Sequence, residues 1–212
     1  VPRGWITASR NDLLDGSVSV GVVDAIVHLE VKHHVVINDD DTREALYRVN
    51  VEGTREWLRW GADHGTRRFI FASSVKAVRA EAGQTLETAA HEAADGYGSS
   101  KAKAEYVVSS WVTAEPHRAA IILRFAPIYG PGNTANLAAF ARQVLRGRPC
   151  FVGQGQTRKS VVSLRNATAA IEWALQSSLA GCEVFNVSDP TAHSISELAT
   201  MIARAGSCPS LS

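Results

Sequence analysis

Short apolar runs alternate with longer amphipathic segments along most of the chain. Runs rich in β-branched residues predict strands at Ala25–Leu29, Arg68–Ala72, Ala119–Phe125, Ser160–Leu164 and Glu183–Val187. Segments whose apolar residues recur every three or four positions predict helices at Thr42–His64, Tyr97–Thr113, Ala135–Arg146, Ala167–Ser178 and Ile195–Arg204. Buried strands that alternate with helices are typical of a parallel sheet covered on both faces, so the pattern predicts a doubly wound α/β fold.

Three positions within these elements carry more specific expectations. Gly53 lies on the apolar stripe of the Thr42–His64 helix, where it would let the helix approach the sheet closely. Ser194 and Glu197 have the spacing of a capping box that opens the last helix. His28 lies within an apolar strand, so we expect a packed core histidine rather than a base or a metal ligand.

The composition is that of a globular protein with a sizeable core. The chain has 212 residues, 45% of them apolar, and a formal net charge of +1. Such a balance gives no global field that would attract nucleic acid or an anionic membrane. The three cysteines show neither disulfide nor zinc-ligand spacing, and the sequence has no run with the length of a membrane span and no signal-peptide pattern. We therefore expect a cytoplasmic protein without a metal site and without a nucleic-acid or membrane partner.

The run Tyr97-Gly98-Ser99-Ser100-Lys101 places a phenol and an ammonium four residues apart, on one face of a predicted helix. A phenol has a pKa of about 10, so it acts as a base near neutral pH only if its anion is favoured by about 4 kcal/mol, and a fixed cation supplies such a bias. Ser74 ends a predicted buried strand and could hydrogen-bond the same substrate oxygen. Ser74, Tyr97 and Lys101 therefore form a candidate catalytic trio, although the Tyr-x-x-x-Lys spacing alone is equally typical of a surface tyrosine beside a solvated lysine.

The order of five motifs carries more information than any one of them. They are Asp24-Ala25-Ile26-Val27-His28-Leu29, Asn50-Val51-Glu52-Gly53-Thr54, the Ser73-Ser74 strand end, the Tyr97/Lys101 helix, and Leu123-Arg124-Phe125-Ala126-Pro127-Ile128-Tyr129-Gly130-Pro131-Gly132. In this order they resemble the extended short-chain dehydrogenase/reductase superfamily. Within it, the chain resembles the NAD-dependent epimerase/dehydratase branch, which contains UDP-glucose 4-epimerases and sugar-nucleotide 4-ketoreductases. The resemblance runs from about Asp12 to about Gly206 and implies a Rossmann-like fold.

The resemblance also implies a domain organisation. Residues 1–125 would form part of a dinucleotide-binding domain, and residues 126–212 would be mainly a small α/β substrate lobe, with segments of the two interleaved. The sequence lacks the Gly-rich turn that normally opens such a domain, and Asp12-Leu13 fall where the family places an adenine-contacting pair near the end of its third strand. We therefore expect a sheet without its first strands and a C-terminus that stops early, in a chain that is either a fragment or a degenerate paralogue.

The family's roles transfer to the residues that match its motifs. By analogy, Tyr97 exchanges a proton with the sugar C4 hydroxyl while hydride passes between C4 and the nicotinamide of NAD or NADP. Lys101 would lower the pKa of Tyr97 and bind the nicotinamide ribose, and Ser74 would orient the C4 oxygen. The cofactor-binding residues so implied are Asp12, Leu13, Leu29, Asn50, Ser73, Tyr97, Lys101 and Pro127. The substrate-binding residues so implied are Ser74, Asn136 and Arg158.

Structural alternatives accompany three of these residues. Asn50 is expected to support the junction of sheet and helix near the active site, but it could equally be a helix asparagine satisfied by local backbone. Pro127 also suits the exit of a strand. Arg158 suits the diphosphate of a UDP-sugar because a guanidinium binds phosphate through two hydrogen bonds, but it could also be a solvated surface arginine.

Three departures from the family pattern affect the chemistry. Glu30 stands where the family carries small residues close to the cofactor, and its carboxylate would oppose a pyrophosphate unless it turns outward. Arg165 stands where an aspartate is common in the family. Val75-Lys76 follow Ser74, which disfavours dehydratase chemistry because no acid is placed to protonate a departing C6 hydroxyl.

The sequence therefore predicts an NAD(P)-dependent sugar-nucleotide 4-epimerase or 4-ketoreductase, present as a fragment. The missing turn and Glu30 favour a non-catalytic dinucleotide-binding or scaffold protein as the alternative. A reductase of a steroid or phenolic ketone is a third option, which would not need Arg158. The family also implies a homodimer through the Thr42–His64 and Tyr97–Thr113 helices. Three tryptophans could form its apolar patch or pack within the monomer: Trp57, Trp60 and Trp111.

Overall fold

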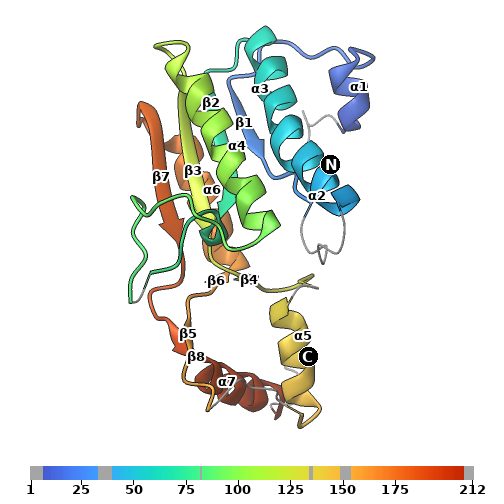
Figure 1. Cartoon of the computed structure of the whole chain (residues 1–212). Coiled ribbons are helices and arrows are strands. Elements are labelled where there is room, and N and C mark those ends of the chain that lie inside the picture. Colours follow the sequence, from blue (N-terminus) through green and yellow to red (C-terminus); the bar gives the residue numbers. More distant parts are fainter. Residues whose placement is uncertain (1–6, 33–39, 82, 134–135, 149–153, 208–212) are drawn as a thin grey trace.

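A computed structural model describes residues 7–32, 40–81, 83–133, 136–148 and 154–207 of the chain. Its centre is a four-stranded parallel sheet in the order β1-β2-β3-β7 (Figure 1). The strands are β1 (Ala25–His28), β2 (Arg68–Ser74), β3 (Ala119–Phe125) and β7 (Gly181–Val187). Four of the five predicted strands therefore form this sheet, and the predicted doubly wound α/β fold is confirmed.

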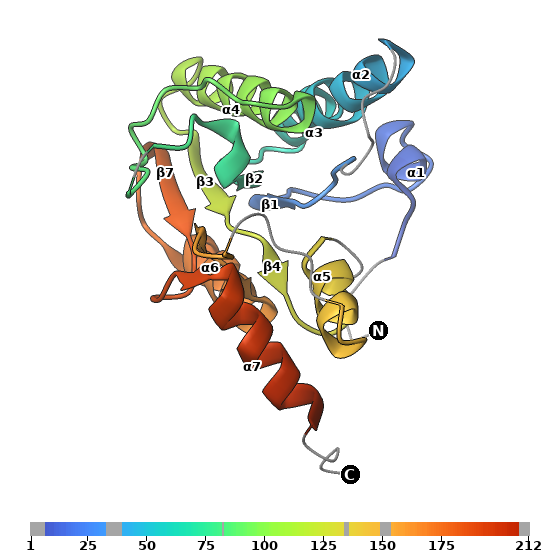
Figure 2. The ribbon, with the colours of Figure 1, turned by 60° about the horizontal axis from the view of Figure 1, so that its bottom comes forward.

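Helices cover both faces of the sheet (Figure 2). They are α2 (Asp40–Tyr47), α3 (Gly53–Asp63) and α4 (Gly96–Thr113) on one face, and α6 (Leu164–Gln176) on the other. Successive strand residues point to opposite faces, so Phe69 and Phe71 pack with Leu58 and Val108 of the first layer, whereas Ile70 packs in the core beneath α6. Burial on both faces explains why the strands read as nearly continuous apolar runs.

The predicted Thr42–His64 helix is present but interrupted. Between α2 and α3 lies a π-helical turn, η1 (Arg48–Glu52), which contains one extra residue per turn. Short π turns inside α-helices often occur at functional sites. Asn50 lies in this turn and is buried.

The close approach expected at Gly53 occurs at another glycine. A methyl group on Gly53 would meet no atom nearer than 3.7 Å, so that prediction is wrong. A methyl group on Gly61 would lie 2.7 Å from Cδ1 of Ile26 and 3.1 Å from Thr66. Gly61 therefore lets α3 approach β1, because the helix meets the sheet at its C-terminal end.

The three tryptophans considered for a dimer patch pack within the monomer. Trp57 packs against the core below α3 and donates through Nε1 to the Glu30 carboxylate at 3.0 Å. Trp60 stacks on His64 and donates to the Leu13 carbonyl at 2.9 Å. Trp111 is buried with the core cluster on the same face of the sheet.

Shorter elements form a second lobe, toward which the carboxyl ends of the sheet strands point (Figure 1). They are β4 (Ile128–Tyr129), α5 (Asn136–Leu145), β5 (Arg158–Lys159), β6 (Val162–Ser163), β8 (His193–Ser194) and α7 (Ile195–Ser207). The predicted Ser160–Leu164 strand shrinks to β6, because the Ser163 hydroxyl caps α6 by accepting from the Asn166 amide at 3.1 Å. The predicted capping box is confirmed, with reciprocal hydrogen bonds of 2.7 and 3.1 Å between Ser194 and Glu197. The helix start expected at Ala135 lies outside the described residues.

Candidate active site

Two elements bring Ser74 and Tyr97 together at the carboxyl edge of the sheet. β2 ends at Ser74, a 3₁₀ turn, η2 (Val75–Ala77), follows it, and α4 begins at Gly96. A Cβ on Gly98 would overlap the carbonyl oxygen of Lys76, so the lack of a side chain there is what lets α4 lie against η2. Ser74 and Tyr97 are then close enough for their side chains to hydrogen-bond.

Lys101 lies one helical turn further along α4 and is 2% exposed. Its Nζ donates to the Ala72 carbonyl at 2.6 Å and lies 4.5 Å from the centroid of the Phe71 ring. Burial lowers the pKa of Lys101 to about 8, and the nearby negative charge of Glu105 opposes that shift. The ammonium therefore lies at the strand end, held by a backbone carbonyl.

The pKa of Tyr97 is raised in this arrangement. Burial of the phenol is the main cause, the Asp95 carboxylate adds to it, and the hydrogen bond with Ser74 acts in the opposite direction. The net direction is opposite to the lowered pKa expected from a neighbouring ammonium. The physical reason is that the phenol loses hydration while the Lys101 ammonium is directed to the Ala72 carbonyl.

An ion pair lies beside Tyr97. Lys76 Nζ is 2.7 Å from the Asp95 carboxylate and 6.0 Å from the centroid of the Tyr97 ring. Asp95 also caps α4, because its Oδ1 accepts from the Gly98 amide at 2.7 Å. Neither Lys76 nor Asp95 was singled out as a site residue from the sequence.

Behind the strand end lies a buried ion pair that sequence reasoning also missed. The Arg124 guanidinium of β3 donates to both carboxylate oxygens of Glu105 in α4, at 2.7 to 3.2 Å, and to the Glu87 carbonyl at 2.8 Å. Ser73 and His91 complete the set of partners of Glu105. A signal for this network exists in the sequence, because an arginine inside the apolar run Ala119–Phe125 needs a buried partner.

Asn50 makes the junction expected of it, through contacts that are not local. Its amide nitrogen donates to the Lys32 carbonyl at 2.9 Å and to the Ser100 hydroxyl at 2.8 Å, and its amide oxygen accepts from the Lys32 backbone at 2.7 Å. Ser100 in turn donates to the Tyr97 carbonyl at 2.7 Å. The π turn in the neighbouring helix is thereby linked to the first turn of α4.

The structure defines the orientation of two residues near the end of β1, Glu30 and His28. Glu30 turns away from the strand end toward α3, where it accepts from Trp57 and lies 3.3 Å from Arg10. His28 is a core histidine, as predicted: it is 3% exposed, stacks against Phe71 and contacts the Thr54 hydroxyl at 3.0 Å. Burial lowers the pKa of His28 to about 3, with the charges of Lys101 and Arg10 acting in the same direction. The imidazole is therefore neutral near pH 7.

The remaining residues expected at the cofactor differ from one another in secondary structure, exposure and hydrogen bonding. Asp12 and Leu13 belong to a short helix, α1 (Arg10–Leu14), rather than to a strand end, and the Asp12 carboxylate accepts from the Ser9 amide at 3.1 Å. Leu29 is exposed just after β1. Pro127 is exposed just after β3, and its carbonyl accepts from Val162 at 3.1 Å. Ser73 directs its hydroxyl to Glu105.

Of the three residues expected at the substrate, Ser74 ends β2, and the other two, Asn136 and Arg158, lie in the second lobe. Asn136 begins α5 and is exposed. Arg158 is exposed in β5 and donates to the Ala192 carbonyl. Next to Arg165, Asn166 donates to the Asp189 carboxylate at 2.7 Å, and the same carboxylate accepts from the Tyr129 hydroxyl at 2.8 Å.

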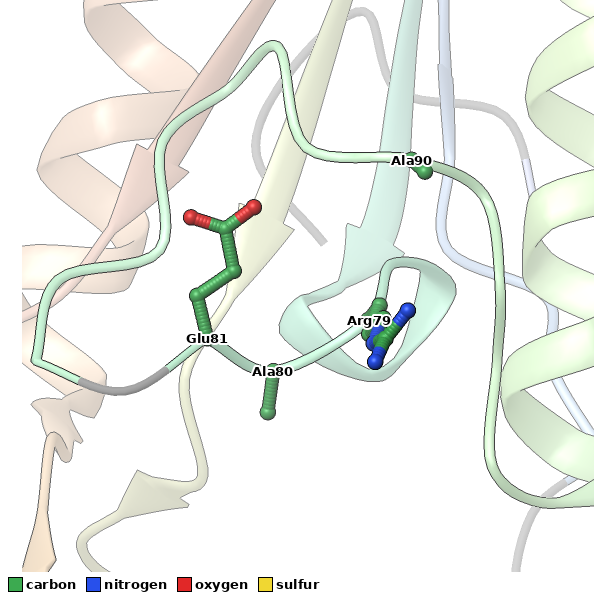
Figure 3. Close-up of a pocket in the computed structure, with 4 residues that line it drawn as sticks. All are labelled: Arg79, Ala80, Glu81 and Ala90. Atoms are coloured by element: carbon green, nitrogen blue, oxygen red, sulfur yellow. The ribbon is translucent and has the colours of Figure 1, made fainter.

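A pocket lies in the loop between η2 and α4, lined by Arg79, Ala80, Glu81 and Ala90 (Figure 3). It belongs to the long connection between Ser74 and Tyr97, and none of the predicted site residues lines it. Within the described residues, no cluster of three histidine, cysteine or acidic side chains is arranged to hold a metal ion. The described helices also include none that is long and apolar enough to cross a bilayer.

Comparisons with known proteins agree with this architecture. A 4-epimerase of N-acetyl-alpha-D-glucosaminyl-diphospho-ditrans,octacis-undecaprenol from Escherichia coli O157:H7 is 32% identical over 167 residues, covering 78% of this chain and 50% of that protein. A UDP-glucose 4-epimerase from Vibrio cholerae is 34% identical over 184 residues, covering 82% of this chain and 56% of that protein. The chain thus spans about half the length of these curated relatives.

The fold is similar to that of solved structures. The structure of RMD from Pseudomonas aeruginosa complexed with NADPH superposes with a TM-score of 0.80 at 24% identity, covering 97% of this chain and 75% of that one. The model of the NAD dependent epimerase/dehydratase family matches residues 6–188. This match takes in the whole four-stranded sheet, the Ser74 strand end and the Tyr97 helix. The chain belongs to the NAD-dependent epimerase/dehydratase family.

Proposed function

We propose that the protein catalyses epimerisation at C4 of a diphosphate-linked sugar, with NAD or NADP as its cofactor. The observation that supports this proposal is that Ser74 and Tyr97 lie within hydrogen-bonding reach at the carboxyl edge of a parallel sheet, with Lys101 on the Ala72 carbonyl of the same strand; open α/β sheets bind their ligands at this edge. Both curated relatives described above are 4-epimerases of sugars joined to a diphosphate. A 4-ketoreductase with the same three residues is the closest variant of this proposal.

The residues at this edge suit a dinucleotide. Glu30, whose carboxylate would repel a pyrophosphate, is held toward α3 by Trp57 and Arg10. Lys101 carries three N–H donors, of which one is directed to Ala72, so donors are left for ribose hydroxyls. A bound NAD or NADP would supply the hydride acceptor and donor for sugar C4. Pro127 and Leu29 flank the same edge of the sheet.

In this proposal the chain's own residues move one proton. Tyr97 holds its proton in the described arrangement because burial and Asp95 raise its pKa, so it is ready to donate to a C4 oxygen. Ser74 hydrogen-bonds the same oxygen and orients it. For the reverse transfer the Lys101 ammonium has to stabilise the phenolate, which requires it to exchange part of its contact with Ala72 for the phenol. Asn136 and Arg158 would bind the diphosphate from the second lobe.

A second candidate function is non-catalytic binding of a nucleotide or nucleotide sugar. The raised pKa of Tyr97 and the engagement of Lys101 with a backbone carbonyl favour it, because they keep the phenol protonated near neutral pH and leave little phenolate to accept a proton from the sugar. Under either function we propose a cytoplasmic protein, as the cysteine usage suggests. A homodimer through the outer faces of α3 and α4 also stays a proposal.

The test uses the protein expressed from its complete coding sequence. It is incubated with NAD and UDP-glucose, UDP-galactose or UDP-N-acetylglucosamine, and the C4 epimers are measured by NMR. We expect interconversion of at least one pair, and a loss of about 10²-fold or more in kcat for Tyr97→Phe. Tyr106→Phe is the matched control, because Tyr106 lies on the same helix, is 58% exposed and lies outside the trio.

The other outcomes each select another function. Net oxidation of NADPH with a 4-keto sugar, and no epimer formed, selects the ketoreductase. Nucleotide binding without turnover of any sugar or ketone selects the non-catalytic protein. Turnover that is unaffected by Tyr97→Phe rejects the proposed mechanism. An Arg158→Ala variant that leaves the KM for UDP-sugars unchanged would favour a substrate without a diphosphate, such as a steroid ketone.

A further inference from the structure

The two side chains of the ion pair beside Tyr97 differ in their freedom to reorient. Asp95 is fixed, because its carboxylate caps α4 at the Gly98 amide. The Lys76 backbone is fixed as well, since it packs against Gly98 without room for a Cβ. The Lys76 side chain is long and about half exposed, at 52%, so only the ammonium end can reorient. The negative charge next to Tyr97 is therefore fixed and the positive charge is movable.

We propose that Lys76 and Asp95 are positioning residues whose opposed charges control how readily the Tyr97 hydroxyl gives up its proton. This inference rests on the proposed function and extends it beyond Ser74, Tyr97 and Lys101. While the Lys76 ammonium contacts the Asp95 carboxylate, the two charges largely cancel and present little net charge to the phenol. When the Lys76 ammonium turns away, the Asp95 carboxylate keeps the phenol protonated; when the ammonium approaches the phenol, it favours the phenolate.

The surroundings of Tyr97 make this pair the adjustable part of its electrostatics. On its own helix the nearest cation is Lys101, which is buried and bound to the Ala72 carbonyl. From β2 it meets the neutral hydroxyl of Ser74. From η2 and from the turn before α4 it meets Lys76 and Asp95. Of these charged groups, the pair alone is solvent-accessible at both ends, with Asp95 45% exposed.

The matched control lies in the same loop. Arg79 and Glu92 form an exposed ion pair at 3.1 Å, with 68% and 63% of their side chains accessible. Removing either charge there changes the net charge of the protein by the same amount as the corresponding change at Lys76 or Asp95. Any difference between the two sets of variants then reports proximity to Tyr97 rather than general charge.

The experiment is a titration of Tyr97 in the full chain without substrate. The ultraviolet absorbance of tyrosinate is followed against pH, and the trace of the Tyr97→Phe variant is subtracted so that the other three tyrosines cancel. We expect the Tyr97 midpoint to fall in Asp95→Asn and to rise in Lys76→Met. Asparagine is also a good N-cap, so Asp95→Asn keeps the helix start intact. Glu92→Gln and Arg79→Met should leave the midpoint unchanged.

In the full enzyme the same variants should move the pH profile of kcat in the same directions, with KM for the sugar nucleotide less affected. The proposal is overturned if the midpoints in Asp95→Asn and Lys76→Met stay within the range of the control variants, or if both move in one direction. The titration needs neither substrate nor cofactor. It can therefore fail while Tyr97→Phe still abolishes turnover, and the failure of the proposed function is seen separately in the turnover assay.

Discussion

Charged side chains are used in different ways in the two lobes of this molecule. Beside the sheet edge, Glu105 and Arg124 are 2% and 1% exposed and bind each other through several hydrogen bonds. In the second lobe Arg158 and Glu197 are both exposed. Arg158 lies in β5, a strand of two residues, and Glu197 lies in the first turn of α7. We therefore expect the strand end that carries Ser74 to be more rigid than the second lobe.

The largest test of this contrast removes one partner of the buried pair. Glu105→Ala leaves the Arg124 guanidinium buried without its carboxylate, so we expect a loss of about 3–5 kcal/mol in the free energy of unfolding. Urea-induced unfolding measures it. Replacing both residues by leucine should recover much of the loss, because no charge is then left buried. A loss below about 1 kcal/mol for Glu105→Ala would mean that the pair is not sealed from solvent.

The second test concerns the buried ammonium. The pKa of Lys101 is about 8 in the folded chain and 10.5 ordinarily, so between these pH values the unfolded chain binds one more proton than the folded chain. Stability should therefore rise with pH through this window, by up to about 3 kcal/mol relative to Lys101→Met. Urea unfolding at several pH values measures it. Lys103→Met changes an exposed position of the same helix, so the free energy of unfolding of this variant should depend on pH as it does in the unaltered protein.

The smallest effect is expected in the second lobe. Tyr129→Phe removes the hydrogen bond from the Tyr129 hydroxyl to Asp189, which lies at the surface. Since water can replace this partner, we expect a loss of about 1 kcal/mol or less in the free energy of unfolding. Thermal unfolding beside the Glu105→Ala variant makes the comparison direct. Equal losses in the two variants would show that the lobes are equally rigid.

The sequence predicted the sheet well because buried strands leave a strong signal. Ala119–Phe125 was predicted with its observed bounds, since every side chain in it except the arginine is apolar. The second lobe was harder to predict: the Ser160–Leu164 run is β-branched at its centre, but Ser163 caps a helix instead of continuing a strand. Capping depends on which hydroxyl reaches which amide, and that depends on tertiary packing.

The sequence predicted the helix that carries Tyr97 and Lys101, but not the electrostatic surroundings of these two side chains. Spacing put Tyr97 and Lys101 on one helix face, as the structure has them, but it could not reveal that Lys101 binds the Ala72 carbonyl. Nor could it pair Lys76 with Asp95, because the contact joins residues 19 positions apart across a loop.

The π turn at Arg48–Glu52 limits which insertions and deletions this helix accepts. Loss of one residue there would restore regular α-helical geometry, because five residues of a π turn wind through nearly the same angle as four α-helical residues, about 400°. Leu46 and Leu58, which lie on either side of the turn and are both buried, would still face the interior together. We therefore expect homologous chains to tolerate a difference of one residue within this turn, whereas loss of one residue from α2 or α3 between the two leucines would rotate one against the other by about 100°.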